Sequence, residues 1–377
     1  MERTAEEIIA EVVGGLKHLK GVRVIAAMSG GVDSSVMAAL LKEAELDVVG
    51  VFLNVWDYSR EDVNAHGSCC SLEDSYDARR VADAVGIPFY AMDMREEFRR
   101  DVIDPFINDY ETGRTPNPCE RCNRFVKFGA LLKAADQLEA EYVATGHYVQ
   151  RTDDERGIHL LKGNDAKKDQ SYFLATTNRQ QAARILFPVG GLEKDDTRKL
   201  ARHYKLPTAE KHESQDICFI PAGDRIAFLK REGASKGFVE GDIVDVLGNK
   251  LGRHQGIAHY TLGQRKGLGL PNGPWHVVGL DGVKAEVVVA HPEDAVIREV
   301  EVGDISWIRK PNEDEQITAK VRYQMLPAAC ELIALGETGQ SLHVRFKAQQ
   351  KPTAPGQVAA FYAGDELLGG GIVSKIL

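Results

Sequence analysis

The chain has 377 residues, which is enough for two or three domains. Hydrophobic residues make up 43% and charged residues 27%, an ordinary globular composition that excludes disordered and fibrous proteins. The formal charge is −9, so a nucleic acid would have to bind at local basic patches. No apolar run is long enough to span a bilayer, and the acidic, amphipathic start is neither a secretory signal nor a transit peptide. We therefore expect a cytoplasmic protein, in which grouped cysteines indicate catalysis or metal binding.

The first 224 residues alternate between patterns typical of buried strands and of helices. Strands are expected at 22–28, 48–56, 87–94 and 141–148, and helices at 33–44, 72–86, 95–110, 124–138 and 193–204. This alternation predicts a doubly wound α/β domain with a parallel sheet.

Beyond residue 225 glycine becomes frequent and the segments become short and β-rich. ITAKVRYQ (317–324) and SLHVRFKA (341–348) alternate apolar and polar residues, as half-buried strands do. We therefore expect two smaller β-rich domains after the α/β domain, the last of them a β-barrel. The predicted domain boundaries are 1–224, 225–294 and 295–377.

SGGVDSS (29–35) follows the first predicted strand and opens a helix. Its glycines permit a tight turn, and the backbone N–H groups of the helix start attract an anion. Ser34 and Ser35 add hydroxyl donors, while Asp33 could hold Mg²⁺ or orient the loop. A simple helix cap would use the same residue types, but two glycines, an acid and three serines together favour phosphate binding. The dinucleotide pattern GxGxxG and the GxxxxGK[ST] loop are both absent.

Cys119 and Cys122 form the one C-x-x-C of the chain, inside TPNPCERCNRF. Asn123 is a candidate cap for the helix that follows, which would place Cys122 beside a helix N-terminus. The helix dipole, together with Arg121 and Arg124, would then favour the thiolate of Cys122. The pattern therefore predicts a reactive sulfur at this position.

Cys218 lies about a hundred residues downstream, in ESQDICFIP. The cysteines could alternatively bind zinc, with His66, Cys69 or Cys70 supplying a fourth ligand. A closed zinc site needs four well-placed ligands, and only one C-x-x-C is present, so we favour sulfur chemistry.

The loop SGGVDSS is the signature of the PP-loop ATP pyrophosphatases. Further blocks, in order TPNPCERCN, ATGHY, KKDQSYFL, SQDICFI, HQGIAHYTLGQRKGLGL, VRYQ and PGQVAAFY, cover essentially the whole chain. Together they resemble the tRNA-uridine 2-sulfurtransferase family, also called tRNA-specific 2-thiouridylases.

This resemblance implies a transferase that uses ATP and Mg²⁺ to convert the wobble uridine, position 34 of tRNA, into 2-thiouridine. ATP would adenylate the C2 oxygen, and sulfur held as a persulfide on Cys218 would then replace it. Cys122 would be the partner nucleophile, and a Cys122–Cys218 disulfide would be the transient end point. The implied partners are tRNA and a sulfur-donor protein, either a persulfide carrier or a cysteine desulfurase, with neither DNA nor a membrane involved.

The resemblance also assigns binding residues. The ATP-binding positions are Ala27, Met28, Ser29, Gly30, Gly31, Val32, Asp33, Ser34, Leu53 and Gly146. The tRNA-binding positions are Asn117, His147, Lys168, Asp169, Gln170, Arg322, Tyr323 and Gln357. Lys320 and Arg322 would share one strand face and Arg345 would lie on another, where they could contact the RNA backbone.

Cys119 departs from the family pattern, since many members carry Asp there. In the persulfide scheme Cys119 lines the pocket beside the target base. Related tRNA thiolases bind a [4Fe–4S] cluster through three cysteines, so Cys119, Cys122 and Cys218 form an alternative ligand set. A second alternative is a PP-loop ligase that forms an amide or guanidino group, although such an enzyme needs no cysteine pair. The sulfur donor, the tRNA set and the oligomeric state stay open.

Overall fold

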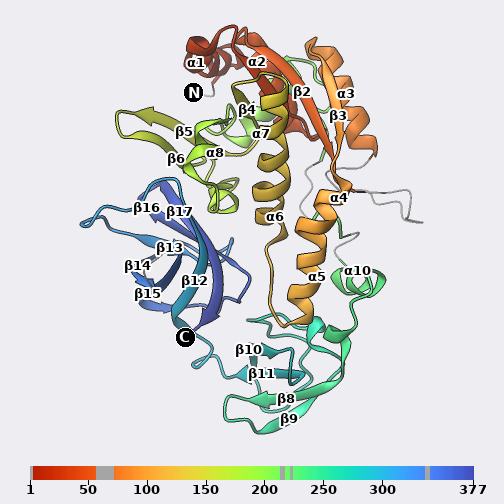
Figure 1. Ribbon diagram of the computed structural model, residues 1–377, viewed down its shortest axis with the longest axis vertical. Coiled ribbons are helices and arrows are strands. Elements are labelled where there is room, and N and C mark those ends of the chain that lie inside the picture. The colour runs from red at the N-terminus through yellow and green to blue at the C-terminus, as the bar shows by residue number, and fades with distance from the viewer. Residues whose placement is uncertain (1–2, 57–71, 213–216, 221–223, 336–339) are drawn as a thin grey trace. The chain divides into compact units, whose positions relative to one another are not determined.

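The chain folds into two compact units in a computed structural model (Figure 1). The structure describes residues 3–56, 72–212, 217–220, 224–335 and 340–377. Unit 1 comprises 1–101, 121–223 and 365–367, and unit 2 comprises 102–120, 224–364 and 368–377. The zinc ligands considered at His66, Cys69 and Cys70 lie outside the described residues.

A five-stranded parallel sheet in the order β3-β2-β1-β4-β7 forms the centre of unit 1. Its strands are β1 (Arg23–Ala27), β2 (Asp47–Asn54), β3 (Phe89–Asp93), β4 (Tyr142–Ala144) and β7 (Ile185–Leu186). The order reverses at β1, which pairs with β2 on one side and with β4 on the other. In open α/β sheets the carboxyl ends of the strands form a ligand crevice at such a switch point.

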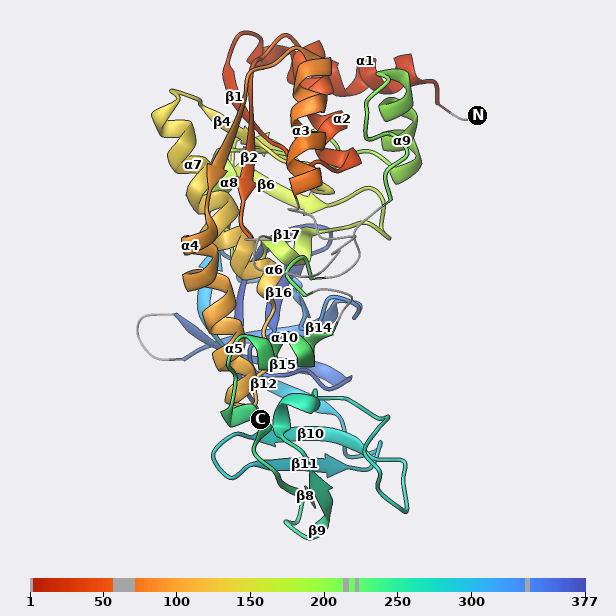
Figure 2. The ribbon, with the colours of Figure 1, turned by 90° about the vertical axis from the view of Figure 1, so that its right-hand side faces the viewer.

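Helices cover both faces of this sheet (Figure 2). They are α1 (Ala5–Leu16), α2 (Val32–Glu43), α3 (Leu72–Val85) and α9 (Lys194–His203) on one face, and α7 (Phe128–Gln137) on the other. Side chains of β1 alternate between the two cores, because Val24 and Ala26 pack with the first group and Ile25 packs with α7. The prediction of a doubly wound α/β fold is therefore confirmed.

Three predicted elements of this region differ in detail. The helices predicted at 95–110 and 124–138 contain π-helical segments, Arg99–Ile103 and Cys122–Lys127. They accompany the helices α4 (Arg95–Phe98), α5 (Asp104–Glu111) and α6 (Pro118–Arg121). The strand predicted at 141–148 ends at Ala144. Beyond this end, Gly146 lies close to the backbone of Asp33 and Ser34 in the first turn of α2.

The remaining elements of unit 1 are small. They are the hairpin β5 (Val149–Asp154) and β6 (Gly157–Lys162), the 3₁₀ turn Ser171–Leu174 and α8 (Arg179–Ala183). Asn178 caps α8 in a capping box with Gln181. Glu366 and Leu367, which also belong to unit 1, pair with β6.

Unit 2 contains a four-stranded sheet in the order β10-β11-β8-β9. Its elements are β8 (Gly241–Asp245), β9 (Lys250–His254), β10 (His276–Asp281) and β11 (Glu286–Ala290), preceded by α10 (Arg225–Arg231). Ile243, Val277 and Val287 are fully buried and form its core.

The C-terminal strands close into a six-stranded barrel, because β12 pairs with both β15 and β17. Its strands are β12 (Ile297–Trp307), β13 (Thr318–Lys320), β14 (Ala328–Leu335), β15 (Ser341–Gln350), β16 (Val358–Ala363) and β17 (Glu366–Ile376). The predicted β-barrel is therefore confirmed, whereas the strand predicted at 317–324 is too long. Arg322 and Tyr323 lie in the turn after β13, so Arg322 does not share a strand face with Lys320.

The predicted domain boundaries stay a prediction, because each of the two compact units combines several separate segments of the chain. Among the described helices, none is both long and apolar enough to cross a membrane.

Candidate nucleotide and sulfur-transfer site

The predicted phosphate loop lies at the switch point, directly after β1 and before α2. Ser34 Oγ accepts a hydrogen bond from the Ser29 backbone N–H at 3.1 Å and donates to the Gly31 carbonyl at 3.1 Å. Ser35 Oγ donates to the same carbonyl at 2.8 Å. The serine hydroxyls thus fix the turn of the loop that precedes α2, and the first backbone N–H groups of a helix are suited to bind an anion.

Two glycines are required by close packing around this loop. Gly30 has φ +71°, and a Cβ there would collide with the backbone carbonyl of Asp74. A Cβ on Gly146 would lie 2.8 Å from the backbone nitrogen of Ser34. Gly146, one of the predicted ATP-binding residues, therefore lets the chain after β4 approach the first turn of α2.

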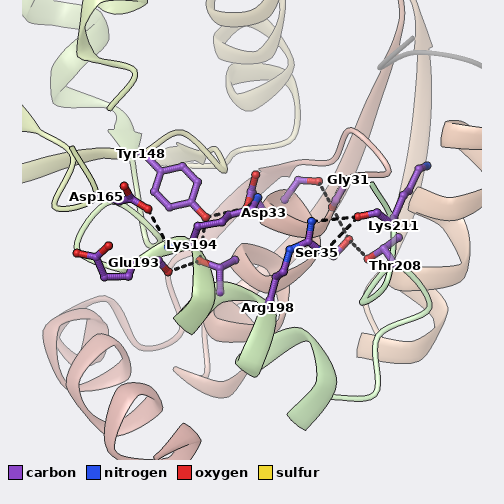
Figure 3. Close-up of polar contacts among 12 residues, drawn as sticks. Gly31, Asp33, Ser35, Tyr148, Asp165, Glu193, Lys194, Arg198, Thr208 and Lys211 are labelled. Carbon is purple, nitrogen blue, oxygen red and sulfur yellow. Dashed lines mark hydrogen bonds and ion pairs between the residues drawn. The ribbon is translucent and has the colours of Figure 1, made fainter. Parts of the chain in front are cut away.

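The carboxylate of Asp33 is held from two sides (Figure 3). Lys194 Nζ donates to Asp33 Oδ1 at 2.6 Å, and the Tyr148 hydroxyl donates to the same oxygen at 2.8 Å. Lys194 is the first residue of α9, where its backbone N–H donates to the buried carboxylate of Asp165. No local sequence pattern marks Lys194 or Tyr148 as part of this site, and only the tertiary structure brings them to Asp33.

A second lysine, Lys211, holds the other side of the loop. Lys211 Nζ donates to the Gly30 carbonyl at 3.0 Å, to Asp74 at 2.6 Å and to Asp77 at 2.5 Å. Burial alone would lower the pKa of Lys211, but its hydrogen bonds to the two carboxylates outweigh burial and raise the pKa. Burial alone would raise the pKa of Asp77, but hydrogen bonds from Lys211 and other donors outweigh it and lower the pKa.

The other predicted ATP-binding residues lie around the same strand ends. Ala27 ends β1, Met28 and Val32 are buried beside it, and Leu53 lies in β2 next to the parallel strand β3. The Met28 N–H donates to the Val51 carbonyl of β2 at 2.9 Å. The structure therefore gathers this predicted set at one edge of the sheet, and its role in binding ATP stays a prediction.

The predicted helix cap before the C-x-x-C is different in the structure. Asn117, rather than Asn123, accepts the capping hydrogen bond, from the Glu120 N–H at 3.2 Å. Asn123 is buried within the π-helical segment that begins at Cys122, and its Nδ2 donates to the Phe173 carbonyl. Cys119 is therefore the cysteine in the first turn of α6, and Cys122 follows one turn later.

Cys122 and Cys218 both belong to unit 1. The Cys122 residue is 8% exposed, whereas Cys218 is partly exposed in a short turn. Phe219, beside Cys218, is buried against the rings of Trp56 and Phe98. This aromatic packing anchors the chain next to Cys218. Cys330 is a buried core thiol of the barrel, and burial raises its pKa to about 12, so it is not a nucleophile at neutral pH.

The predicted tRNA residues of unit 1 are held by internal hydrogen bonds. His147 Nδ1 lies 2.9 Å from Thr145 Oγ1, and its ring contacts the rings of Phe128 and Phe187. Burial, helped by the charge of Lys127, lowers the pKa of His147 to about 3. His147 is therefore neutral at physiological pH and can offer RNA a hydrogen bond but not a positive charge.

Lys168, Asp169 and Gln170 also take part in local structure. Asp169 accepts hydrogen bonds from the backbone of Gly163 and Ser171, and Gln170 accepts one from the Tyr148 N–H at 3.0 Å. This pairing connects the predicted tRNA-binding block to the residue that holds Asp33.

In unit 2 two of the predicted tRNA-binding residues donate hydrogen bonds to the backbone of other segments. Arg322 Nη2 donates to the Leu262 carbonyl at 2.7 Å. Gln357 Nε2 donates to the Thr115 carbonyl at 2.8 Å, and the Thr115 N–H donates to the Pro355 carbonyl at 2.9 Å. The loop that contains Gln357 therefore holds the extended segment that leads to Asn117 and Cys119.

Two basic residues of β15, His343 and Arg345, are paired with the same acid. Glu299 of β12 accepts hydrogen bonds from His343 at 2.7 Å and from Arg345 at 2.9 Å. Tyr323 is 38% exposed, and Lys320 lies over its ring at 5.1 Å. Because Glu299 already pairs with Arg345, we expect Arg345 to contribute less than a full positive charge to RNA binding.

Within the described part of the chain, no three side chains of His, Cys, Asp or Glu lie close enough together to hold a metal ion. The binding of an iron–sulfur cluster by Cys119, Cys122 and Cys218 stays a prediction.

A parallel sheet with an SGGVDSS loop at its switch point defines the chain as a PP-loop protein, a class that uses ATP with Mg²⁺. Three family models match it in order: the tRNA methyl transferase HUP domain at 22–222, the tRNA methyl transferase PRC-barrel domain at 226–291 and the aminomethyltransferase beta-barrel domain at 297–373. The chain is 46% identical over 364 residues to the tRNA-specific 2-thiouridylase MnmA of Geobacter metallireducens, which covers 94% of this chain and 97% of the relative. It is 47% identical over 363 residues to the corresponding protein of Geotalea uraniireducens, covering 94% and 96%. The chain belongs to the tRNA-specific 2-thiouridylase family, which sets the ligase alternative aside.

Among solved structures, the U34-tRNA thiolase NcsA from Methanococcus maripaludis is similar at 17% identity and a TM-score of 0.36. The likeness covers 60% of this chain and 72% of that one, and it is too weak to support a conclusion about this site.

Proposed function

We propose that this protein is an ATP-dependent tRNA-uridine 2-sulfurtransferase that converts the wobble uridine of tRNA to 2-thiouridine. The observation that carries the proposal is the presence, in one unit, of an ordered phosphate loop and of Cys122 and Cys218. The loop accounts for ATP activation, and two thiols account for a sulfur nucleophile and its resolution.

The first step activates the base. The C2 oxygen of the uridine attacks the α-phosphorus of ATP, and the bond to the β-phosphate breaks, so that pyrophosphate leaves and the C2 oxygen carries AMP. Backbone N–H groups of the loop at Gly30 to Asp33 would bind the departing pyrophosphate through the positive end of α2.

The second step transfers sulfur. Cys218 would carry the persulfide, whose terminal sulfur attacks C2 and forms the new C–S bond. The Cys122 thiolate then attacks the inner sulfur of Cys218, which breaks the S–S bond, forms the Cys122–Cys218 disulfide and lets AMP leave with the C2 oxygen. A cellular thiol would reduce this disulfide before a sulfur-donor protein, either a persulfide carrier or a cysteine desulfurase, reloads Cys218.

The residues of the loop fit the Mg²⁺ that accompanies ATP. Asp33 uses Oδ1 for its contacts with Lys194 and Tyr148, and among the described residues Oδ2 has no hydrogen-bond partner. Mg²⁺ in nucleotide sites is commonly held through one or two carboxylates and the phosphates, so a single acid is sufficient here. The metal would supply charge neutralisation on the phosphates.

For tRNA, the proposed contacts are His147 and the Lys168–Gln170 block in unit 1, and Asn117, Arg322, Tyr323 and Gln357 in unit 2. A cytoplasmic location fits a tRNA substrate.

The test is nucleoside mass spectrometry of tRNA treated with enzyme, ATP and a persulfide source. Cys122→Ser and Cys218→Ser should abolish 2-thiouridine, because serine keeps the volume but not the sulfur nucleophile, while both should still bind ATP. Cys330→Ala is the matched control, since this thiol lies in the barrel core. Formation of 2-thiouridine by Cys218→Ser at the wild-type rate would refute the persulfide assignment.

Variants of Cys119 distinguish the persulfide mechanism from one that uses a [4Fe–4S] cluster. In the persulfide scheme Cys119→Asp restores the commoner family residue and should keep activity. In the cluster scheme that variant loses a ligand. About four irons per chain after anaerobic purification, together with iron-dependent activity that Cys119→Asp abolishes, would establish the cluster instead.

A further inference from the structure

Lys194 holds the acidic residue of the phosphate loop, although its own position in the sequence suggests only a charged helix start. Its Nζ lies 2.6 Å from Asp33 Oδ1, and its side chain is 10% exposed. The backbone of Lys194 is fixed by Asp165, and its ammonium also lies over the Tyr148 ring at 5.6 Å. The first residue of α9 thus places a positive charge beside the loop, and its backbone is fixed by Asp165.

The position of the Lys194 ammonium determines how phosphate groups can approach the loop. A carboxylate at the loop repels incoming phosphates, and a partly buried ammonium beside it cancels that repulsion. The lysine stem is flexible, so the ammonium can move by a few ångströms while α9 stays in place. A pair of opposite charges at a phosphate site can therefore open when a ligand offers each charge a better partner.

Lys211 provides the contrast on the other side of the loop. Its ammonium donates to three acceptors of the chain itself, namely the Gly30 carbonyl, Asp74 and Asp77. An ammonium has three donors, so Lys211 already satisfies its full capacity and acts as a fixed support. The loop therefore has on one side a lysine whose hydrogen bonds support the fold, Lys211, and on the other a lysine whose ammonium pairs with the acid of the loop, Lys194.

We propose that Lys194 is a nucleotide-binding residue, whose ammonium exchanges the Asp33 carboxylate for a phosphate oxygen of ATP when the loop is occupied. The inference rests on the proposed function, because it requires that ATP binds at this loop. The exchange removes the ammonium from the Asp33 carboxylate, which could then bind Mg²⁺, a metal that prefers carboxylate oxygens. Tyr148 remains on Asp33 and acts as a positioning residue.

Calorimetric titration with ATP plus Mg²⁺, and separately with adenosine, tests this proposal. The variants are Lys194→Met, Asp33→Asn and the double variant, with Lys199→Met as control. Lys199 lies in the same helix, but its ammonium donates to the Arg3 carbonyl, away from the loop. Thermal unfolding of each variant without nucleotide gives the stability change separately.

Lys194→Met should weaken the binding of ATP by about tenfold or more, as expected for one charge-assisted hydrogen bond, and leave adenosine binding nearly unchanged. The same loss should persist when Asp33→Asn is compared with the double variant, because the phosphate contact does not depend on Asp33. The double variant leaves no unpaired charge, so this comparison stands even if Lys194→Met alone fails to fold.

Two results would overturn the inference: an equal loss of ATP and adenosine binding, or no further loss in the Asp33→Asn background. Either would make Lys194 a structural partner of Asp33. A wild-type protein that binds no ATP at all would instead refute the proposed function.

Discussion

Replacing Lys211 with methionine tests how strongly the phosphate loop depends on its fixed support. The change keeps most of the side-chain volume but removes the ammonium from Asp74 and Asp77, whose side chains are 8% and 9% exposed. Loss of one partner from a buried ion pair costs about 3–5 kcal/mol. Because the Lys211 side chain is 28% exposed, solvent screening reduces this, and we expect about 2–3 kcal/mol.

The loss should depend on pH in a defined direction. The pKa of Asp77 is lowered by folding, so its contribution is present above its unfolded value of about 4 and disappears as pH falls through the folded pKa. The pKa of Lys211 is raised, so its contribution is present below about 10.4 and disappears as pH rises through the folded pKa. The difference between wild type and Lys211→Met should therefore be largest between about pH 4 and pH 10.

Urea unfolding, together with hydrogen exchange of amides in α2 and α3, measures this difference within unit 1. Lys20→Met is the control, because Lys20 and Glu45 form an exposed pair and should contribute about 0–1 kcal/mol. Adding Asp77→Asn to Lys211→Met should recover part of the stability, since one unpaired carboxylate is removed. A difference below about 0.5 kcal/mol, or one that stays constant from about pH 3 to pH 8, would refute the reasoning.

Three further predictions concern the buried histidine, tRNA binding and the segment that leads to Cys119. Because burial lowers the pKa of His147 to about 3, this residue makes the folded protein less stable as pH falls below about 6.5. His147→Gln should therefore reduce the loss of stability measured by acid unfolding. An unchanged dependence of stability on pH would contradict the burial of this imidazole. Arg322→Gln should reduce the slope of log K for tRNA binding against log salt concentration by about one unit. Arg345→Gln should reduce it by less, because Glu299 already pairs with Arg345. Equal slopes in the two variants would contradict this difference. Gln357→Ala should release the Thr115 carbonyl and raise the alkylation rate of Cys119 in the tRNA-free protein; an unchanged rate would show that the barrel loop does not restrain this segment.

The sequence by itself determined the class of fold and the chemistry of the main groups. The continuous apolar segment at β1 predicts a buried parallel strand, because such strands are covered on both faces. The glycines and serines of the loop predict an anion site from local backbone requirements alone. The order of motifs indicated the family, since each block is local in the chain.

Only the tertiary structure decided which side chains surround the loop and how the predicted contacts are used. Lys194 and Lys211 are far from Asp33 and Gly30 in the sequence, and no local pattern marks an ammonium that folding brings to a carboxylate or a carbonyl. The same is true of Asn117, which takes the cap expected of Asn123 because the helix begins earlier than the apolar spacing suggested. Local periodicity reports which face of an element is buried, whereas hydrogen-bond partners between distant segments depend on the packing of the whole unit.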